Sequence, residues 1–91
     1  AVFALAFLST QAIDLARGDF EFTGIGMDAK VFERDANLWL QGSGQPAFRL
    51  LWQGGLEFRA EFDTDVRLVL AADGQALVLH QDGRKAEGVR K

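Results

Sequence analysis

The chain has 91 residues, no cysteine, and a net charge of −3 at pH 7, with 48% hydrophobic and 25% charged residues. This composition is typical of one small globular domain, 1–91. It excludes disulfides, zinc–thiolate sites and a cysteine nucleophile, and it argues against a nucleic-acid partner, because neutralising phosphates requires an excess of Lys and Arg.

The N-terminal segment allows two interpretations. In one, residues 2–17 form a single helix that ends at Gly18 in the left-handed conformation. In the other, a strand is followed by a short helix capped by Ser9 or Thr10. The apolar residues 1–8 are far fewer than the roughly 20 that span a bilayer, and they lack the basic start of a signal peptide. Membrane contact is therefore not expected unless they belong to a longer segment.

Residues 19–25, DFEFTGI, alternate between polar and apolar and predict a strand. They overlap the motif Gly24-x-Gly26-x-x-Ala29, the outline of a dinucleotide-binding turn. That turn must lead into a helix and a parallel strand, with an acidic residue about 20 positions later. The later segments instead have the pattern of antiparallel hairpins, and the apolar FRLLW occupies the acidic position. We therefore interpret the glycines as a bulge or bend in a strand and expect no cofactor.

Two further strands are predicted next, at residues 29–34, AKVFER, and at 37–41, NLWLQ. For the first of these, a short helix over 27–36 is the alternative. A flexible loop, GSGQP, then leads to a strand at 48–53, FRLLWQ.

The turns that follow predict how the strands pair. A two-residue turn at Gly54-Gly55 would send the apolar residues of the two flanking strands to opposite faces, whereas a three-residue loop, Gln53–Gly55, keeps them on one face. A loop at Asp63–Asp65 and a two-residue turn at Asp73-Gly74 likewise keep the apolar residues of their flanking strands on one face. The predicted cross-strand pairs are Leu38–Leu50, Trp39–Arg49, Leu40–Phe48, Trp52–Leu56, Leu50–Phe58, Phe48–Ala60, Phe62–Val66, Ala60–Leu68, Phe58–Leu70, Leu70–Leu77 and Leu68–Leu79.

These pairs place one apolar set on the core face of the sheet: Phe48, Leu50, Trp52, Leu56, Phe58, Phe62, Val66, Leu68, Leu70, Leu77 and Leu79. A turn at Asp82-Gly83 would lead into a weak, polar last strand that frays. The predicted fold class is α+β. The segment 1–17, a helix or a strand plus a short helix, would pack on a mostly antiparallel β-meander of about five to seven strands over 19–88.

Catalytic residue types are scarce. His80 is the only histidine, and the predicted register places it on the outer face opposite Arg67, a cation that disfavours its use as a base. The Asp63-Thr64-Asp65 segment lacks the other ligands and the glycine of a calcium loop. We therefore expect no catalytic residue, no metal site and no enzymatic activity.

The predicted outer face is the candidate binding site. Its register gives a row of Trp39, Arg49, Arg59, Val69 and Val78, with Phe32 beside Trp39 and a Glu61–Arg67 pair in the next row. Trp and Arg are enriched at binding hot spots, and Arg49 stacked on Trp39 would gain cation–π energy. The predicted binding residues are Trp39, Arg49 and Arg59. The alternative is that Trp39 lies under the GSGQP loop and that the arginines are merely solvated.

These features favour a non-enzymatic interaction or assembly module that binds another protein, or itself, through its sheet. The helix-then-meander plan resembles periplasmic lipoprotein carriers, and this resemblance implies the alternative function, a carrier for an apolar ligand or lipid between helix and sheet. The segment VRLVLAADGQALVLHQDGR is similar in style to the β-rich heads of minor pseudopilins. A small hydrolytic enzyme ranks third. The composition indicates a GC-rich bacterial genome and fits both cytoplasm and periplasm.

Overall fold

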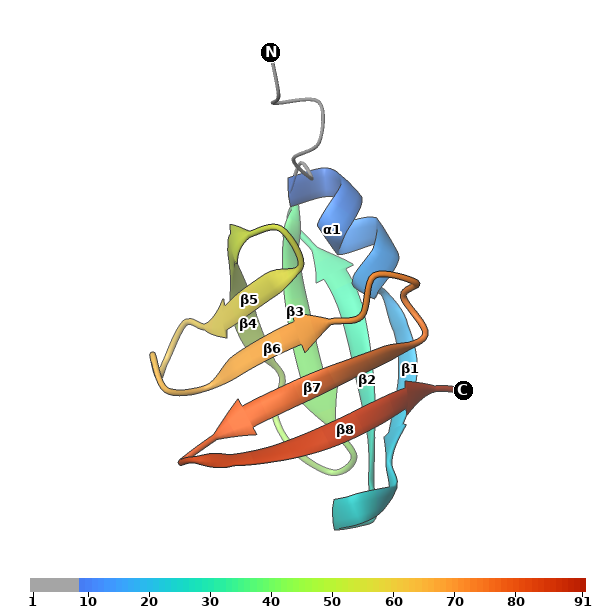
Figure 1. The fold of residues 1–91 in the computed structure, drawn as a ribbon. Helices are drawn as coiled ribbons and strands as arrows, with labels where there is room; N and C mark the ends of the chain where they lie inside the picture. The colour runs from blue at the N-terminus through green and yellow to red at the C-terminus, as the bar shows by residue number, and fades with distance from the viewer. Residues whose placement is uncertain (1–8) are drawn as a thin grey trace.

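The computed structural model describes residues 9–91, in which eight antiparallel strands form a closed barrel with a helix at one end (Figure 1). The strands pair in chain order, and the last pairs with the first. The elements are α1 (Ser9–Ala16), β1 (Gly18–Phe22), the 3-10 turn η2 (Thr23–Ile25), β2 (Met27–Arg34), β3 (Asn37–Gly42), β4 (Phe48–Gly54), β5 (Glu57–Ala60), β6 (Arg67–Leu70), β7 (Ala76–Gln81) and β8 (Arg84–Arg90).

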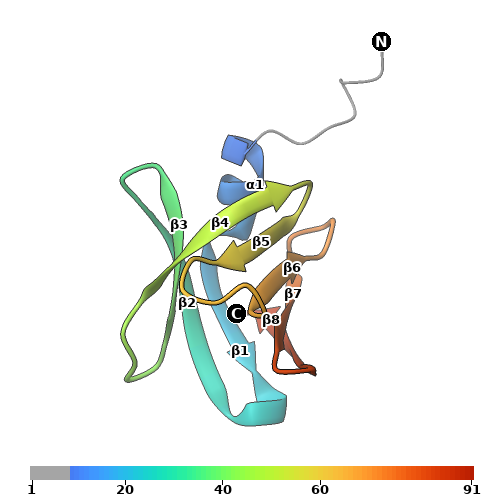
Figure 2. The same ribbon diagram turned by 90° about the vertical axis from the view of Figure 1, so that its left-hand side faces the viewer.

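The predicted α+β fold, a helix covering a meander, is wrong. The sheet curls until β8 pairs with β1, with Phe20 opposite Arg90 and Glu21 opposite Val89. Its apolar face is therefore covered by the sheet itself, and no helical layer is needed. On the inner face, Gly88 leaves room for the ring of Phe22 on the neighbouring strand β1. The helix instead packs across one end of the barrel (Figure 2).

The helix buries one side in the barrel end through Ala12, Ile13 and Ala16. Gly18 does not end it in the left-handed conformation, because Gly18 begins β1 with a φ of 143°. The predictions for residues 1–8 lie outside the described residues. Within residues 9–91, no helix is long and apolar enough to cross a membrane.

The last strand does not fray as predicted, because β8 pairs with β7 on one side and with β1 on the other. The turn before it is confirmed, with positive φ at both Asp82 and Gly83. Arg90 then fixes the strand's end: its guanidinium donates to the carbonyl oxygens of Leu15, Arg17 and Gly74, each at 2.7 Å. One side chain thus joins the helix, the β6–β7 loop and the seam that closes the barrel.

The register prediction is confirmed between β3 and β4 and between β6 and β7. It is wrong by two residues around β5, where Leu50 faces Ala60 and Trp52 faces Phe58. Phe58 likewise faces Leu68 instead of Leu70. The β4–β5 turn begins two residues later than predicted, at 55–56 instead of 53–55, and an irregularity in β4 accompanies it. A shift of two residues keeps every side chain on its face, so the apolar pattern does not detect it.

The centre of the barrel is filled by aromatic side chains, since Phe20, Phe22 and Phe58 are almost fully buried. The first two belong to β1 and were absent from the predicted core. Two predicted core residues, Trp52 and Phe62, lie at the barrel ends and are 37% and 65% exposed. At the end opposite the helix, Phe62 packs edge-to-face on Phe48 with ring centroids 5.1 Å apart.

The Gly24–Gly26 segment joins two antiparallel strands, β1 and β2, through the short turn η2. Gly26 has a φ of 62°, as such a turn requires. The strand over AKVFER is confirmed and the alternative helix over 27–36 is wrong. The Asp73-Gly74 turn keeps its predicted register, but only Gly74 has positive φ and the loop is longer than two residues.

Candidate binding surface on the outside of the barrel

Two aromatic side chains and one arginine form a stacked group on the outside of the barrel, which we call the aromatic–arginine cluster: Phe32, Arg34 and Trp39. Phe32 on β2 lies directly opposite Trp39 on β3, and both are half-buried. The Arg34 Cζ atom lies 5.2 Å from the ring centroid of Phe32 and 4.9 Å from that of Trp39. Trp39 Nε1 also donates to the Arg34 carbonyl oxygen at 3.3 Å.

Local sequence explains this arrangement. Phe32 and Arg34 are two residues apart on one strand, so both point outward. Asp35 and Ala36 then adopt positive φ values of 53° and 65°, the conformation of a tight hairpin turn whose twist matches that of the strands. The turn brings Trp39 back beside Phe32. The predicted neighbourhood of Phe32 and Trp39 is therefore present.

Arg49 lies opposite Trp39 as predicted, but its guanidinium binds a carboxylate and is not the cation stacked on the Trp39 ring. Its Nη2 binds the Glu61 carboxylate on the far side of β4, and its buried Nε has no hydrogen-bond partner among the described residues. The cation stacked on Trp39 is Arg34, which the sequence analysis missed. The signal that would have found it is the outward Phe32-x-Arg34 spacing just before the turn.

Arg59 lies apart from this group. It faces Leu51 on β4 and Arg67 on β6, so the structure brings Trp39 and Arg49 together and leaves Arg59 in the next row. The predicted Glu61–Arg67 pair is also wrong, since Arg67 Nη1 lies 3.6 Å from Glu57.

Apolar surface continues from the cluster along β4. Leu51 points outward and is half-buried, diagonally beside Trp39. At the helix end of the strand, Trp52 is held by a 2.9 Å hydrogen bond from its Nε1 to the Gly55 carbonyl oxygen. Ile13 of α1 lies near this end of β4, where it lines a hollow together with Leu51 and Trp52.

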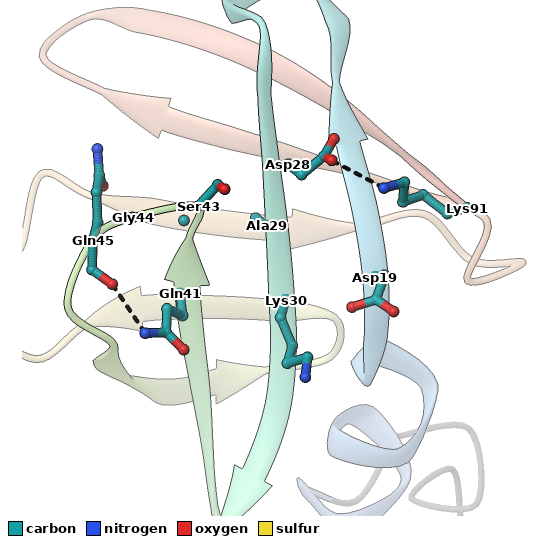
Figure 3. Close-up of a pocket in the computed structure, with 10 residues that line it drawn as sticks. Asp19, Asp28, Ala29, Lys30, Gln41, Ser43, Gly44, Gln45 and Lys91 are labelled. Carbon is teal, nitrogen blue, oxygen red and sulfur yellow. Dashed lines mark hydrogen bonds and ion pairs between the residues drawn. The ribbon is translucent and has the colours of Figure 1, made fainter.

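A polar hollow of about 400 Å³ lies over β1, β2 and the start of the β3–β4 loop. Its charged side chains are two carboxylates, Asp19 and Asp28, and two ammonium groups, Lys30 and Lys91 (Figure 3). Lys91 Nζ donates to Asp28 at 2.9 Å, and this hydrogen bond, with the carboxylate charge, raises the pKa of Lys91. The four charges balance, so the hollow has no excess charge to attract an ionic ligand.

His80 lies on the outer face, opposite Arg67 as predicted and opposite Lys85 on its other side. The Asp63 carboxylate accepts a hydrogen bond from the Asp65 backbone N–H at 2.9 Å, which is the role of an aspartate in a turn. Over residues 9–91, the structure shows no group of three or more side chains able to hold a metal ion. No family model, curated protein or solved structure matches the chain.

Proposed function

We propose that the protein is a non-enzymatic interaction module that binds another protein through the outside of β2, β3 and β4. The observation that carries this proposal is the aromatic–arginine cluster. Its rings lie outside a barrel whose core is filled by other residues, so the stacking of Phe32, Arg34 and Trp39 is not part of the core packing.

The composition and order of the cluster support this role. Trp and Arg are the residue types that contribute most to protein–protein binding energy. Here the Arg34 guanidinium is already stacked and the Trp39 indole already hydrogen-bonded, so less side-chain entropy is lost on binding. The neighbouring Leu51 adds apolar area. A partner with an apolar side chain beside a carboxylate would match the rings and Arg34.

The carrier hypothesis ranks second. It placed an apolar ligand between a helix and an open sheet, but the equivalent space in a closed barrel is the interior. Phe20, Phe22 and Phe58 occupy that interior. A hydrolytic enzyme remains third, because His80, the only histidine, lies on the outer wall between two basic side chains, Arg67 and Lys85.

The proposal is tested by site-specific photocross-linking in the native cell. A benzophenone amino acid replaces Phe32, and in a control chain it replaces Glu21, an exposed outward residue on β1. We expect a defined adduct from position 32 only, which mass spectrometry identifies as a protein or as a second copy of the chain. Identical adducts from both positions would contradict a specific surface.

Affinity for the identified partner is then measured with purified proteins. Trp39→Ala and Arg34→Ala should each weaken binding at least about tenfold, or about 1.4 kcal/mol, whereas Glu21→Ala should change it less than about twofold. Thermal unfolding checks that all three variants remain folded. Unchanged affinity in Trp39→Ala would show that the cluster is only a solvated surface.

A further inference from the structure

Four basic side chains lie directly side by side on four consecutive strands, and we call them the basic row: Arg59 on β5, Arg67 on β6, His80 on β7 and Lys85 on β8. The strand register pairs Arg59 with Arg67, Arg67 with His80 and His80 with Lys85. The predicted register placed Arg59 beside Arg49. In the structure β5 is shifted by two residues relative to both neighbouring strands, so Arg59 lies beside Arg67 and extends the row to β5.

The row is unfavourable for the isolated protein. Neighbouring strands are about 4.8 Å apart, so three steps gather these groups within about 14 Å. Like charges directly opposite each other destabilise a sheet. Of the four, Arg67 has an ion pair, with Glu57 at 3.6 Å, whereas Arg59 and Lys85 have none within residues 9–91. A chain with a net charge of −3 thus gathers three cations in one line, and two of them, Arg59 and Lys85, have no ion pair within residues 9–91.

The surroundings of the row define what fits there. On one side, the adjacent row is Glu57, Val69, Val78 and Glu87, with two half-buried valines in the middle. On the other side lies a hollow of about 640 Å³ between the β5–β6 and β7–β8 loops, lined by Arg67, His80 and Lys85 and by residues of both loops. Positive charge, apolar surface and an open depression therefore lie next to one another.

We propose that the basic row is a docking site for an acidic–hydrophobic segment of a partner protein. Two or three carboxylates of the segment lie over Arg59, Arg67 and Lys85, and an apolar side chain rests on Val69 and Val78. Such a segment neutralises the like charges and covers the apolar pair. This site lies on β5–β8 and is independent of the aromatic–arginine cluster.

The flanking charges favour a protein over a nucleic acid. Carboxylates border the row on both sides, with Glu57 and Glu87 on one and Asp65 and Asp82 at the hollow. A nucleic-acid strand carries a continuous line of phosphates and would bring some of them close to these carboxylates. Glutamates spaced along a peptide can avoid them.

The test uses NMR titration of the isotope-labelled protein with a synthetic peptide that contains four glutamates and two leucines. We expect shifts concentrated at Arg67, Val78, His80 and Lys85, and an affinity that falls at least about tenfold as salt is raised to physiological strength. The Arg59→Gln/Lys85→Gln variant should lose at least about tenfold in affinity. It should be no less stable than the parent, because it removes like charges without breaking an ion pair.

The matched control is Arg17→Gln/Lys30→Gln, which removes the same charge from α1–β1 and β2 and should change the affinity less than about twofold. Trp39→Ala should also leave peptide binding unchanged, which separates this site from the proposed function. Equal loss in the control, or equal binding of the same peptide with glutamine for glutamate, overturns the proposal. Tighter binding of a single-stranded oligonucleotide of equal charge overturns it in favour of a nucleic acid.

Discussion

Arg90 stands out among single residues because its side chain serves three elements. Helix ends leave carbonyl oxygens without intrahelical partners, and Arg90 donates to two near the end of α1, those of Leu15 and Arg17. Its Nε donates to Gly74 in the β6–β7 loop, and its Cζ lies 4.7 Å from the ring centroid of Phe20. The planar, forked guanidinium suits this geometry, whereas an ammonium group does not.

We therefore expect Arg90→Lys to lower the free energy of unfolding by about 2–4 kcal/mol, since hydrogen bonds from a charged donor contribute about 1.5–3 kcal/mol each and lysine retains only some of them. Urea denaturation measures the loss. The control is Arg84→Lys at an exposed position, which should stay within about 0.5 kcal/mol of the parent. Equal stability of the two variants would mean that the Arg90 contacts contribute little.

The candidate binding residues show what sequence can locate at this scale. Trp39 and Arg49 were correctly placed side by side, because they belong to strands whose register the apolar pattern and the loop fix together. Arg59 was misplaced by the two-residue shift of β5. Arg34 was missed because its position depends on a hairpin turn, Asp35-Ala36, without the usual glycine.

At the scale of elements, β8 depends on a residue without a side chain. A Cβ built on Gly88 would lie 2.7–2.9 Å from three ring carbons of Phe22, closer than carbon atoms pack. Phe22 is fully buried against this strand, so the ring and the strand cannot separate without opening the barrel wall.

Gly88→Ala should accordingly lower the free energy of unfolding by about 1–3 kcal/mol through overpacking. Gly24→Ala is the control, because its Cβ meets nothing within 4 Å, and it should be neutral or stabilising by up to about 1 kcal/mol. Thermal and urea unfolding measure both. Combining Gly88→Ala with Phe22→Leu should recover part of the loss; a purely additive double variant would refute the clash.

Strand positions were more predictable than strand partners. Period-two alternation marked AKVFER, NLWLQ, FRLLWQ and the segments after them as strands. The β6–β7 register followed from centring the turn on Asp73-Gly74, which places Leu70 opposite Leu77 although the loop is longer than two residues. Around β5, two registers that differ by two residues give equally apolar cross-strand pairs, so the apolar pattern could not distinguish them. The observed turn depends on positive φ values at Gly54 and Gly55, which the pattern does not indicate.

At the scale of the whole molecule, barrel closure was the feature least visible in the sequence. It depends on β8, which is largely polar, and on a pairing of Phe20 with Arg90, 70 residues apart. Short turns in the sequence indicate which neighbouring strands pair, but no turn or other local sequence signal indicates that the first strand pairs with the last. The apolar face therefore suggested an open sheet that a helix must cover.

This long-range seam should form late in folding, because the entropy of closing so long a loop opposes it until other contacts exist. Leu77→Ala, in the local β6–β7 hairpin, should mainly slow refolding. Phe20→Leu, at the seam, should mainly speed unfolding. Stopped-flow measurements across a denaturant series distinguish the two. If Phe20→Leu slowed refolding as much as Leu77→Ala does, per kcal/mol of unfolding free energy lost, the seam would already be formed in the transition state.

Closure also limits how any partner can attach. An open sheet ends in edge strands whose free N–H and C=O groups capture a further strand from a peptide or from another copy of the chain. In this barrel each of the eight strands has a hydrogen-bonded neighbour on both sides. Within residues 9–91, strand addition and edge-to-edge aggregation therefore find no unpaired strand, and recognition there uses side chains on the outer wall and ends of the barrel.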